Sequence, residues 1–85
     1  MPKAIKNFLG YSIYFYSNEG NEPIHVHVSK GGPSDNSTKF WIKRDEIVME
    51  NNNNNIPKND LKKIVKYLNA NRDRIVGSWY SYFGM

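Results

Sequence analysis

The stretch from Glu22 to Val28 reads EPIHVHV, and apolar and polar residues alternate over its last five positions, 24–28. Alternation with a period of two is typical of a β-strand, whose side chains point to opposite faces in turn. The polar set consists of His25 and His27, the two histidines of the chain. Residues 24–28 therefore predict a strand that turns an apolar face to a core and both imidazoles to the opposite face, toward solvent.

Other stretches on either side also have the composition of strands. Residues 11–16 (YSIYFY) and 38–42 (TKFWI) are rich in aromatic and β-branched residues, and residues 46–50 (EIVME) predict a weaker fourth strand. Turn-forming residues separate these runs. The first half of the chain is thus expected to form three to four strands.

The hydrophobic period changes after five consecutive asparagines, residues 51–55, which predict an exposed loop. Apolar residues then recur at helical spacing over about 57–83, with a break near NANRD, where Asn71 would cap a second helix. Strands followed by helices predict an α+β fold: a small, mostly antiparallel sheet of three to four strands packed against one or two C-terminal helices. We expect one domain over 1–85, with its β half at about 11–50.

Composition excludes several classes of site. The chain has no cysteine, which rules out disulfides, thiolate nucleophiles and cysteine-ligated zinc. The sequence shows no secretory signal and no run of roughly 18 apolar residues, so we expect a cytoplasmic protein that does not contact a membrane. Twelve basic residues against eight acidic ones give a net charge of +4, which permits attraction to nucleic acid or to an acidic protein but is common among small proteins.

The alternation places a distinctive set of side chains on the face of the histidines. This set comprises Tyr14, Tyr16, Lys39 and Trp41, continued by Lys43. Aromatic rings can stack on bases, lysines neutralise phosphates, and histidines transfer protons near neutral pH. The combination predicts an RNA-binding or RNA-cleaving surface in which His25 and His27 act as acid and base and Lys39 stabilises phosphate charge.

Two other interpretations of the histidine pair stay open. A His-x-His pair on a strand can supply two nitrogen ligands to a divalent metal ion, with Glu19, Glu22 or Asp45 as a candidate third ligand. The acid/base interpretation, in contrast, requires no cofactor. Alternatively, the imidazoles only hydrogen-bond the preceding loop through Glu19 or Glu22 and hold it against the sheet. The aromatic rings also have an alternative to an exposed binding surface, in which residues 4–10 fold back and cover Trp41 and the tyrosines.

A lysine stripe marks the helical half. Lys58, Lys62 and Lys66 recur every four residues, with Lys63 beside them. Such a stripe can meet phosphates or an acidic partner. The outer face of an amphipathic helix normally carries charge, however, so a solvated face is the preferred interpretation.

The run FLGYSIYFYSNEGNEPIHVHV, then KFWI, then a lysine-rich helix ending in SWYSYF, resembles the bacterial family named domain of unknown function 4160. In that family the histidine motif is usually Pro-Pro-His-x-His, so Ile24 stands where a second proline is common, and the asparagine tract replaces a shorter turn. The residues that match the family motif are Ser17, Asn18, Glu19, Gly20, Glu22, Pro23, His25, His27, Lys39, Phe40, Trp41 and Trp79.

The resemblance implies a small, soluble bacterial protein that is often encoded beside another small protein, as in toxin–antitoxin pairs. The expected function is accordingly a component of such a pair that binds or acts on RNA. The alternative is a non-catalytic interaction module, antitoxin-like or regulatory, that binds the neighbouring protein.

Overall fold

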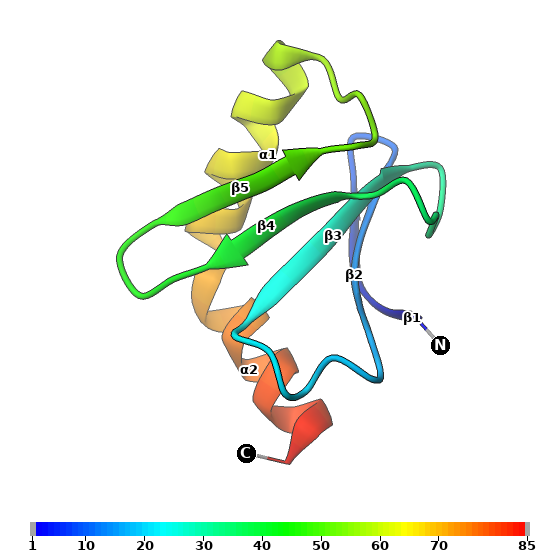
Figure 1. The fold of residues 1–85 in the computed structure, drawn as a ribbon. Coiled ribbons are helices and arrows are strands. Elements are labelled where there is room, and N and C mark those ends of the chain that lie inside the picture. The colour runs from blue at the N-terminus through cyan, green and yellow to red at the C-terminus, as the bar shows by residue number, and fades with distance from the viewer. Residues whose placement is uncertain (1, 85) are drawn as a thin grey trace.

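A computed structural model describes residues 2–84 of the chain. Its elements, in order, are β1 (Pro2–Phe8), β2 (Tyr11–Tyr16), β3 (His25–Lys30), β4 (Thr38–Ile42), β5 (Ile47–Asn52), α1 (Lys58–Ala70) and α2 (Arg72–Phe83). The strands form one antiparallel sheet in the order β1-β2-β3-β4-β5, with α1 behind it and α2 continuing toward its lower end (Figure 1). The predicted α+β fold is confirmed, but the sheet has five strands instead of three to four.

The missed strand is β1. It pairs with β2 from Pro2 opposite Tyr16 to Phe8 opposite Tyr11, and Leu9 and Gly10, with φ angles of 54° and 81°, form the turn between them. An edge strand is paired on one side only, so it tolerates the lysines and the proline that make PKAIKNF a poor strand by composition. The predicted cover over Trp41 is therefore wrong, because this segment extends the sheet at the edge away from β4.

The asparagine tract is only partly a loop, because its first two residues belong to β5. The side-chain oxygen of Asn52 accepts hydrogen bonds from the Thr38 hydroxyl (2.7 Å) and the Ile56 amide (3.0 Å), and its amide group donates to the Ile56 carbonyl (3.1 Å). Asn55 adopts the left-handed conformation (φ 54°), which asparagine tolerates better than most residues. The tract thus ties the last strand to the start of α1.

Replacing Asn52 with alanine is expected to lower the free energy of unfolding by about 1–3 kcal/mol, because the buried Thr38 hydroxyl loses its acceptor and the Ile56 backbone loses its side-chain partner. Asn53→Ala is the matched control. Asn53 is exposed, and its loss should change stability by less than about 0.5 kcal/mol. Urea unfolding of both variants tests this, and equal midpoints would contradict the assignment.

The core lies between the sheet and the helices. Its centre is formed by the apolar side chains of β2, β3 and β4, which pack against Ile64, Leu68 and Ile75. The predicted helix break is confirmed, since α1 ends at Ala70 and α2 begins at Arg72, although the Asn71 side chain donates to the Tyr67 carbonyl and does not cap α2. Among residues 2–84, no helix has the length and apolar character needed to cross a bilayer.

Candidate functional site

The sheet brings the residues predicted for the histidine face together. Tyr14 of β2 and Lys39 of β4 lie opposite His27 on either side, and Trp41 lies opposite His25. The Tyr16 ring centroid is 5.0 Å from that of His27. The antiparallel register therefore joins on one face the side chains that alternation assigned to it.

The middle of this face is covered, which corrects the expectation from alternation, although Tyr16, Lys39 and Trp41 stay half-buried. Tyr14 and His25 are fully buried and His27 is 9% exposed. The loop between β3 and β4 is fastened over Tyr14, whose hydroxyl oxygen lies 2.8 Å from Ser29 Oγ and accepts a hydrogen bond from the Ser34 amide (3.1 Å). The Tyr14 ring consequently has no free surface on which a base could stack.

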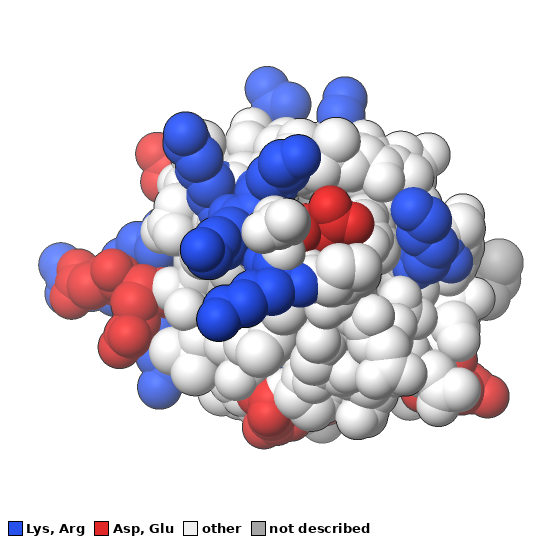
Figure 2. All heavy atoms as spheres, turned by 90° about the horizontal axis from the view of Figure 1, so that it is seen from above, with Lys and Arg blue, Asp and Glu red and all other residues white. Residues whose placement is uncertain are grey.

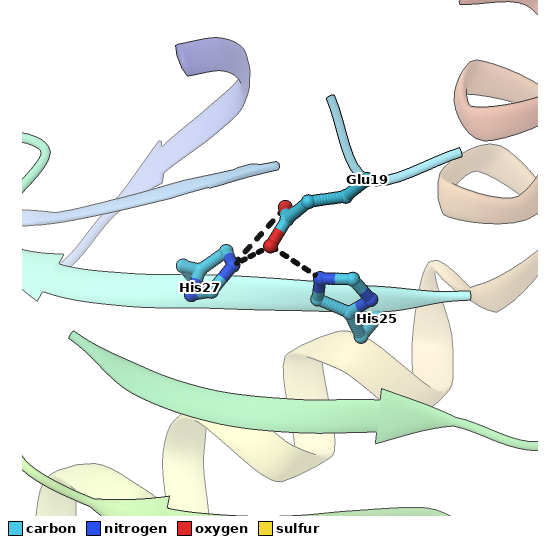
Figure 3. Close-up of side chains that lie close together, drawn as sticks. All are labelled: Glu19, His25 and His27. Carbon is cyan, nitrogen blue, oxygen red and sulfur yellow. Dashed lines mark hydrogen bonds and ion pairs between the residues drawn. The ribbon is translucent and has the colours of Figure 1, made fainter. Parts of the chain in front are cut away.

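Glu19, in the loop between β2 and β3, turns its carboxylate onto the histidines. The loop folds back because the Glu19 amide donates to the Tyr16 carbonyl (3.2 Å), while the Tyr16 amide donates to Glu19 Oε1 (2.7 Å). Glu19 Oε2 then lies 3.0 Å from His25 Nε2 and 2.9 Å from His27 Nε2 (Figure 3). One carboxylate oxygen thus contacts both imidazoles.

The contact with His25 is unusual. Its Nδ1 lies 2.9 Å from the Pro23 carbonyl, and because a carbonyl only accepts, Nδ1 carries a proton. In a neutral ring, Nε2 then has a lone pair, which faces the carboxylate. His25 Nε2 is buried, and among residues 2–84 it has no partner with hydrogen-bond geometry, although Glu19 Oε2 is at ion-pair distance. A second ring proton or a bound cation is needed between the two atoms.

His27 and Glu19 have shifted pKa values. Burial lowers the pKa of His27 despite the opposing effect of Glu19, so the neutral ring is favoured. Burial alone would raise the pKa of Glu19, but the Tyr16 amide and the His27 and His25 imidazoles outweigh it and the pKa is lowered. A neutral imidazole and an ionised carboxylate are the forms in which these groups bind a metal.

Aromatic rings hold the imidazoles in place. The His25 ring centroid lies 5.3 Å from that of Trp41 and 5.2 Å from that of Trp79 on α2. The His27 ring stacks against Tyr14 at 5.6 Å, and its Nδ1 lies 2.9 Å from Ser37 Oγ. The orientation of both rings is therefore determined by packing as well as by hydrogen bonds.

The remaining predicted residues lie outside this centre. Lys39 Nζ is 3.2 Å from Glu22 Oε1 and 4.2 Å from the centroid of Trp41, whose indole N–H donates to Glu50 (3.1 Å). Glu22 thus pairs with Lys39 and not with a histidine. Lys43 is exposed beyond the end of β4, and Asp45 lies in the exposed turn before β5.

Gly20 allows the Glu19 loop to reach α2. A Cβ at this position would lie 2.6 Å from Phe83 Cδ1, which is shorter than the contact distance of two non-bonded carbon atoms. Gly20→Ala is therefore expected to displace the loop and to lower the free energy of unfolding by roughly 1–3 kcal/mol. Gly32→Ala is the control, because its Cβ would have no atom within 4 Å. Chemical denaturation of both variants measures the difference, and equal stabilities would contradict this packing.

Sequence patterns missed several supporting residues. Ser37 and the Pro23 carbonyl contact the Nδ1 atoms of the histidines, and Ser29 and Ser34 hold Tyr14. Trp79 lies in the predicted helical region and matches the family motif, but nothing in its spacing indicated contact with His25. Only the polar character of the loops signalled that they could supply hydrogen bonds.

The model of a protein family described as Domain of unknown function (DUF4160) matches residues 10–80, which include every residue of the centre. No curated protein and no solved structure matches the chain. The chemistry of the site is therefore argued from its own geometry.

Proposed function

The chain belongs to this family of unknown function, and from that premise we propose that it is a metal-binding protein in which Glu19, His25 and His27 hold one divalent transition-metal ion, with zinc as the best fit. The observation that carries the proposal is the convergence of two imidazole nitrogens on one carboxylate oxygen, at 3.0 and 2.9 Å. Two nitrogen ligands and one oxygen ligand form a donor set that zinc and related ions prefer.

The spacing of the donor atoms fits such an ion. One ligand atom from each of the three residues can be chosen so that all lie within 4.8 Å of one another. Ligands about 2.0–2.2 Å from a zinc ion are separated by roughly 3.3 Å in a tetrahedral site, so small movements suffice. A cation would also remove the unfavourable contact between the His25 lone pair and the carboxylate.

The surrounding contacts are those that metal ligands usually have. A ligating histidine generally donates its other ring N–H to a carbonyl or another acceptor, which fixes the tautomer. His25 makes this contact with the Pro23 carbonyl, and Ser37 Oγ is placed to accept from His27. Three protein ligands leave a fourth position for water or a substrate group, as in catalytic zinc sites.

A zinc titration followed by histidine-resolved NMR tests the proposal. We expect saturable shifts of the His25 and His27 Nε2 resonances at a stoichiometry of one ion per chain, with the Nδ1–H of His25 retained. Magnesium is the control, because it prefers oxygen ligands and should cause no such shifts. The absence of zinc-induced shifts at both histidines would refute the metal centre.

Cleavage or binding of RNA, as in a toxin–antitoxin component, is a second candidate activity for the loaded site. It is favoured by the position of Lys39 beside His27, next to the part-exposed Trp41 ring. The Lys39 ammonium would stabilise phosphate charge, and an ion held by Glu19, His25 and His27 would supply a Lewis acid beside it. Expression of the wild type and of His27→Ala in bacteria, with growth and RNA integrity as readouts, tests it. Equal growth and intact RNA in both would exclude it.

Acidification is expected to destabilise the metal-free protein. The folded pKa of His27 lies below the value of about 6.5 for the unfolded chain. The unfolded state then binds more protons, so the stabilisation present above pH 6.5 is lost as the pH falls through the folded pKa. The lowered pKa of Glu19 adds a further loss below about pH 4.3. Urea midpoints between pH 7 and 5 should fall in the wild type and fall less in His27→Gln. If the urea midpoints of the two proteins fell equally with pH, His27 would not be the source of the pH dependence.

A further inference from the structure

A second surface, independent of the metal centre, lies between β5 and α1. It is a groove of about 450 Å³ with an apolar floor and three lysines at its rim. The floor is formed by Phe40, Ile47, Met49, Leu61 and Val65, and the lysines are Lys58, Lys62 and Lys66. Met49 is 43% exposed within it. The sequence favoured a solvated helix face for these three lysines. In the structure they border an apolar surface.

The outer edge of β5 borders the same groove. β5 is the last strand of the sheet, and within residues 2–84 no other strand pairs with its outer side. Edge strands are usually protected by lysine or proline, as β1 is by Lys6. β5 (IVMENN) carries neither residue, although a bulge interrupts its pairing with β4 after Met49. Its backbone groups from Ile47 to Met49 can therefore accept a further strand.

The charge at the rim is not compensated. Lys58, Lys62 and Lys66 form no ion pair with any described carboxylate, since the ion pairs between the described side chains, those of residues 5–84, all involve Glu19, Glu22 or Glu50. Figure 2, which views the end of the molecule where α1 begins, shows lysine and arginine side chains gathered there. A ligand that fills the groove is thus favoured if it is acidic.

We propose that this groove and the free edge of β5 bind an extended acidic segment of a partner protein, which adds to the sheet as a sixth strand. Alternate side chains of such a strand point to the helix side of the sheet, where apolar ones would cover Met49 and Leu61 and acidic ones would meet the lysines. The apolar floor favours a peptide over RNA, because phosphate groups gain nothing from a surface made of methionine and leucine side chains.

Selection from a displayed library of random nine-residue peptides tests the proposal. We expect recovered peptides in which the alternate positions that face the helix hold both apolar residues and Asp or Glu, two or four residues apart. Bound peptide should shift the amide resonances of Ile47 to Met49. Two N-methylated peptides should then differ, one methylated at its odd-numbered amides and the other at its even-numbered amides. Only one of them should lose binding, because only one set of N–H groups can face β5.

Lys62→Glu and Lys63→Glu form a matched pair for this test. Both change the net charge equally, but Lys62 lines the groove and Lys63 does not. Fluorescence anisotropy of a selected peptide should show roughly tenfold or greater weakening for Lys62→Glu, and a much smaller change for Lys63→Glu.

Three outcomes would overturn the proposal. One is recovery of no binding peptide. Another is equal weakening by the two substitutions, which would reduce the effect to net charge. The third is displacement of the peptide by a single-stranded uridine dodecamer that binds more tightly and contacts the same residues, which would assign the surface to nucleic acid.

Discussion

Replacing Glu19 with glutamine is expected to weaken zinc binding by about a hundredfold or more. Loss of a group that merely orients a metal ligand already costs 10–100-fold, and Glu19 supplies a ligand atom itself. The amide oxygen of glutamine can still accept the hydrogen bond from the Tyr16 amide (2.7 Å in the wild type), so the loop should keep its path. The substitution thus removes the charge and the strong oxygen ligand while changing the local structure little.

Glu22→Gln is the matched control. Glu22 lies in the same loop, but its carboxylate contacts Lys39 and neither histidine. Isothermal titration calorimetry should therefore give a zinc dissociation constant for Glu22→Gln close to that of the wild type. If both variants bound zinc as tightly as the wild type, Glu19 would not be a ligand.

Thermal unfolding provides a second readout of the same variant. A ligand that binds only the folded state stabilises it by about 2.7 kcal/mol at a concentration of 100 times its dissociation constant. Zinc at that concentration should raise the unfolding temperature of the wild type and of Glu22→Gln, and leave that of Glu19→Gln nearly unchanged. If Glu19→Gln were less stable than the wild type without zinc but showed the same zinc-induced rise in unfolding temperature, Glu19 would support the loop and would not be a metal ligand.

The histidine face could be predicted because it depends on local alternation. Residues two apart on a strand share a face whatever surrounds them, so the strand assignments put His27, Tyr14 and Lys39 on one face, and strand pairing then made them neighbours. What covers that face could not be predicted, because the loops that bury Tyr14 are held by contacts between residues 15 and 20 positions apart. Alternation identifies a face but not its neighbours.

The third member of the metal centre was predicted only as one of several candidates. Glu19 and Glu22 lie in the same loop and have the same chemistry. The choice between them depends on the turn in which the Tyr16 amide binds the Glu19 carboxylate, and on Lys39, which attracts Glu22. The turn follows from local backbone geometry, but the position of Lys39 follows from the pairing of β3 with β4, which no spacing in the sequence encodes.

Replacing Trp79 with alanine is expected to lower the free energy of unfolding by about 3–5 kcal/mol, the usual cost of removing a large buried aromatic ring. Trp79 is 1% exposed, and its ring centroid lies 5.1 Å from Phe15 and 4.6 Å from Phe83. Small domains have a total stability of roughly 5–15 kcal/mol, so the variant should lose a large part of it. Tyr80→Ala is the control: Tyr80 is on the same helix but 43% exposed, so its loss should cost much less.

Trp79→Phe separates the role of the ring in the core from its role at the metal centre. Phenylalanine keeps part of the packing, so this variant should remain folded, but the smaller ring leaves space beside His25, whose centroid is 5.2 Å away in the wild type. We expect zinc affinity to fall by more than the matched change in Tyr80→Phe, because His25 would lose the contact that orients it. Unchanged zinc affinity in a folded Trp79→Phe variant would show that Trp41 and the Pro23 carbonyl are sufficient to position His25, and that Trp79 contributes only to the core.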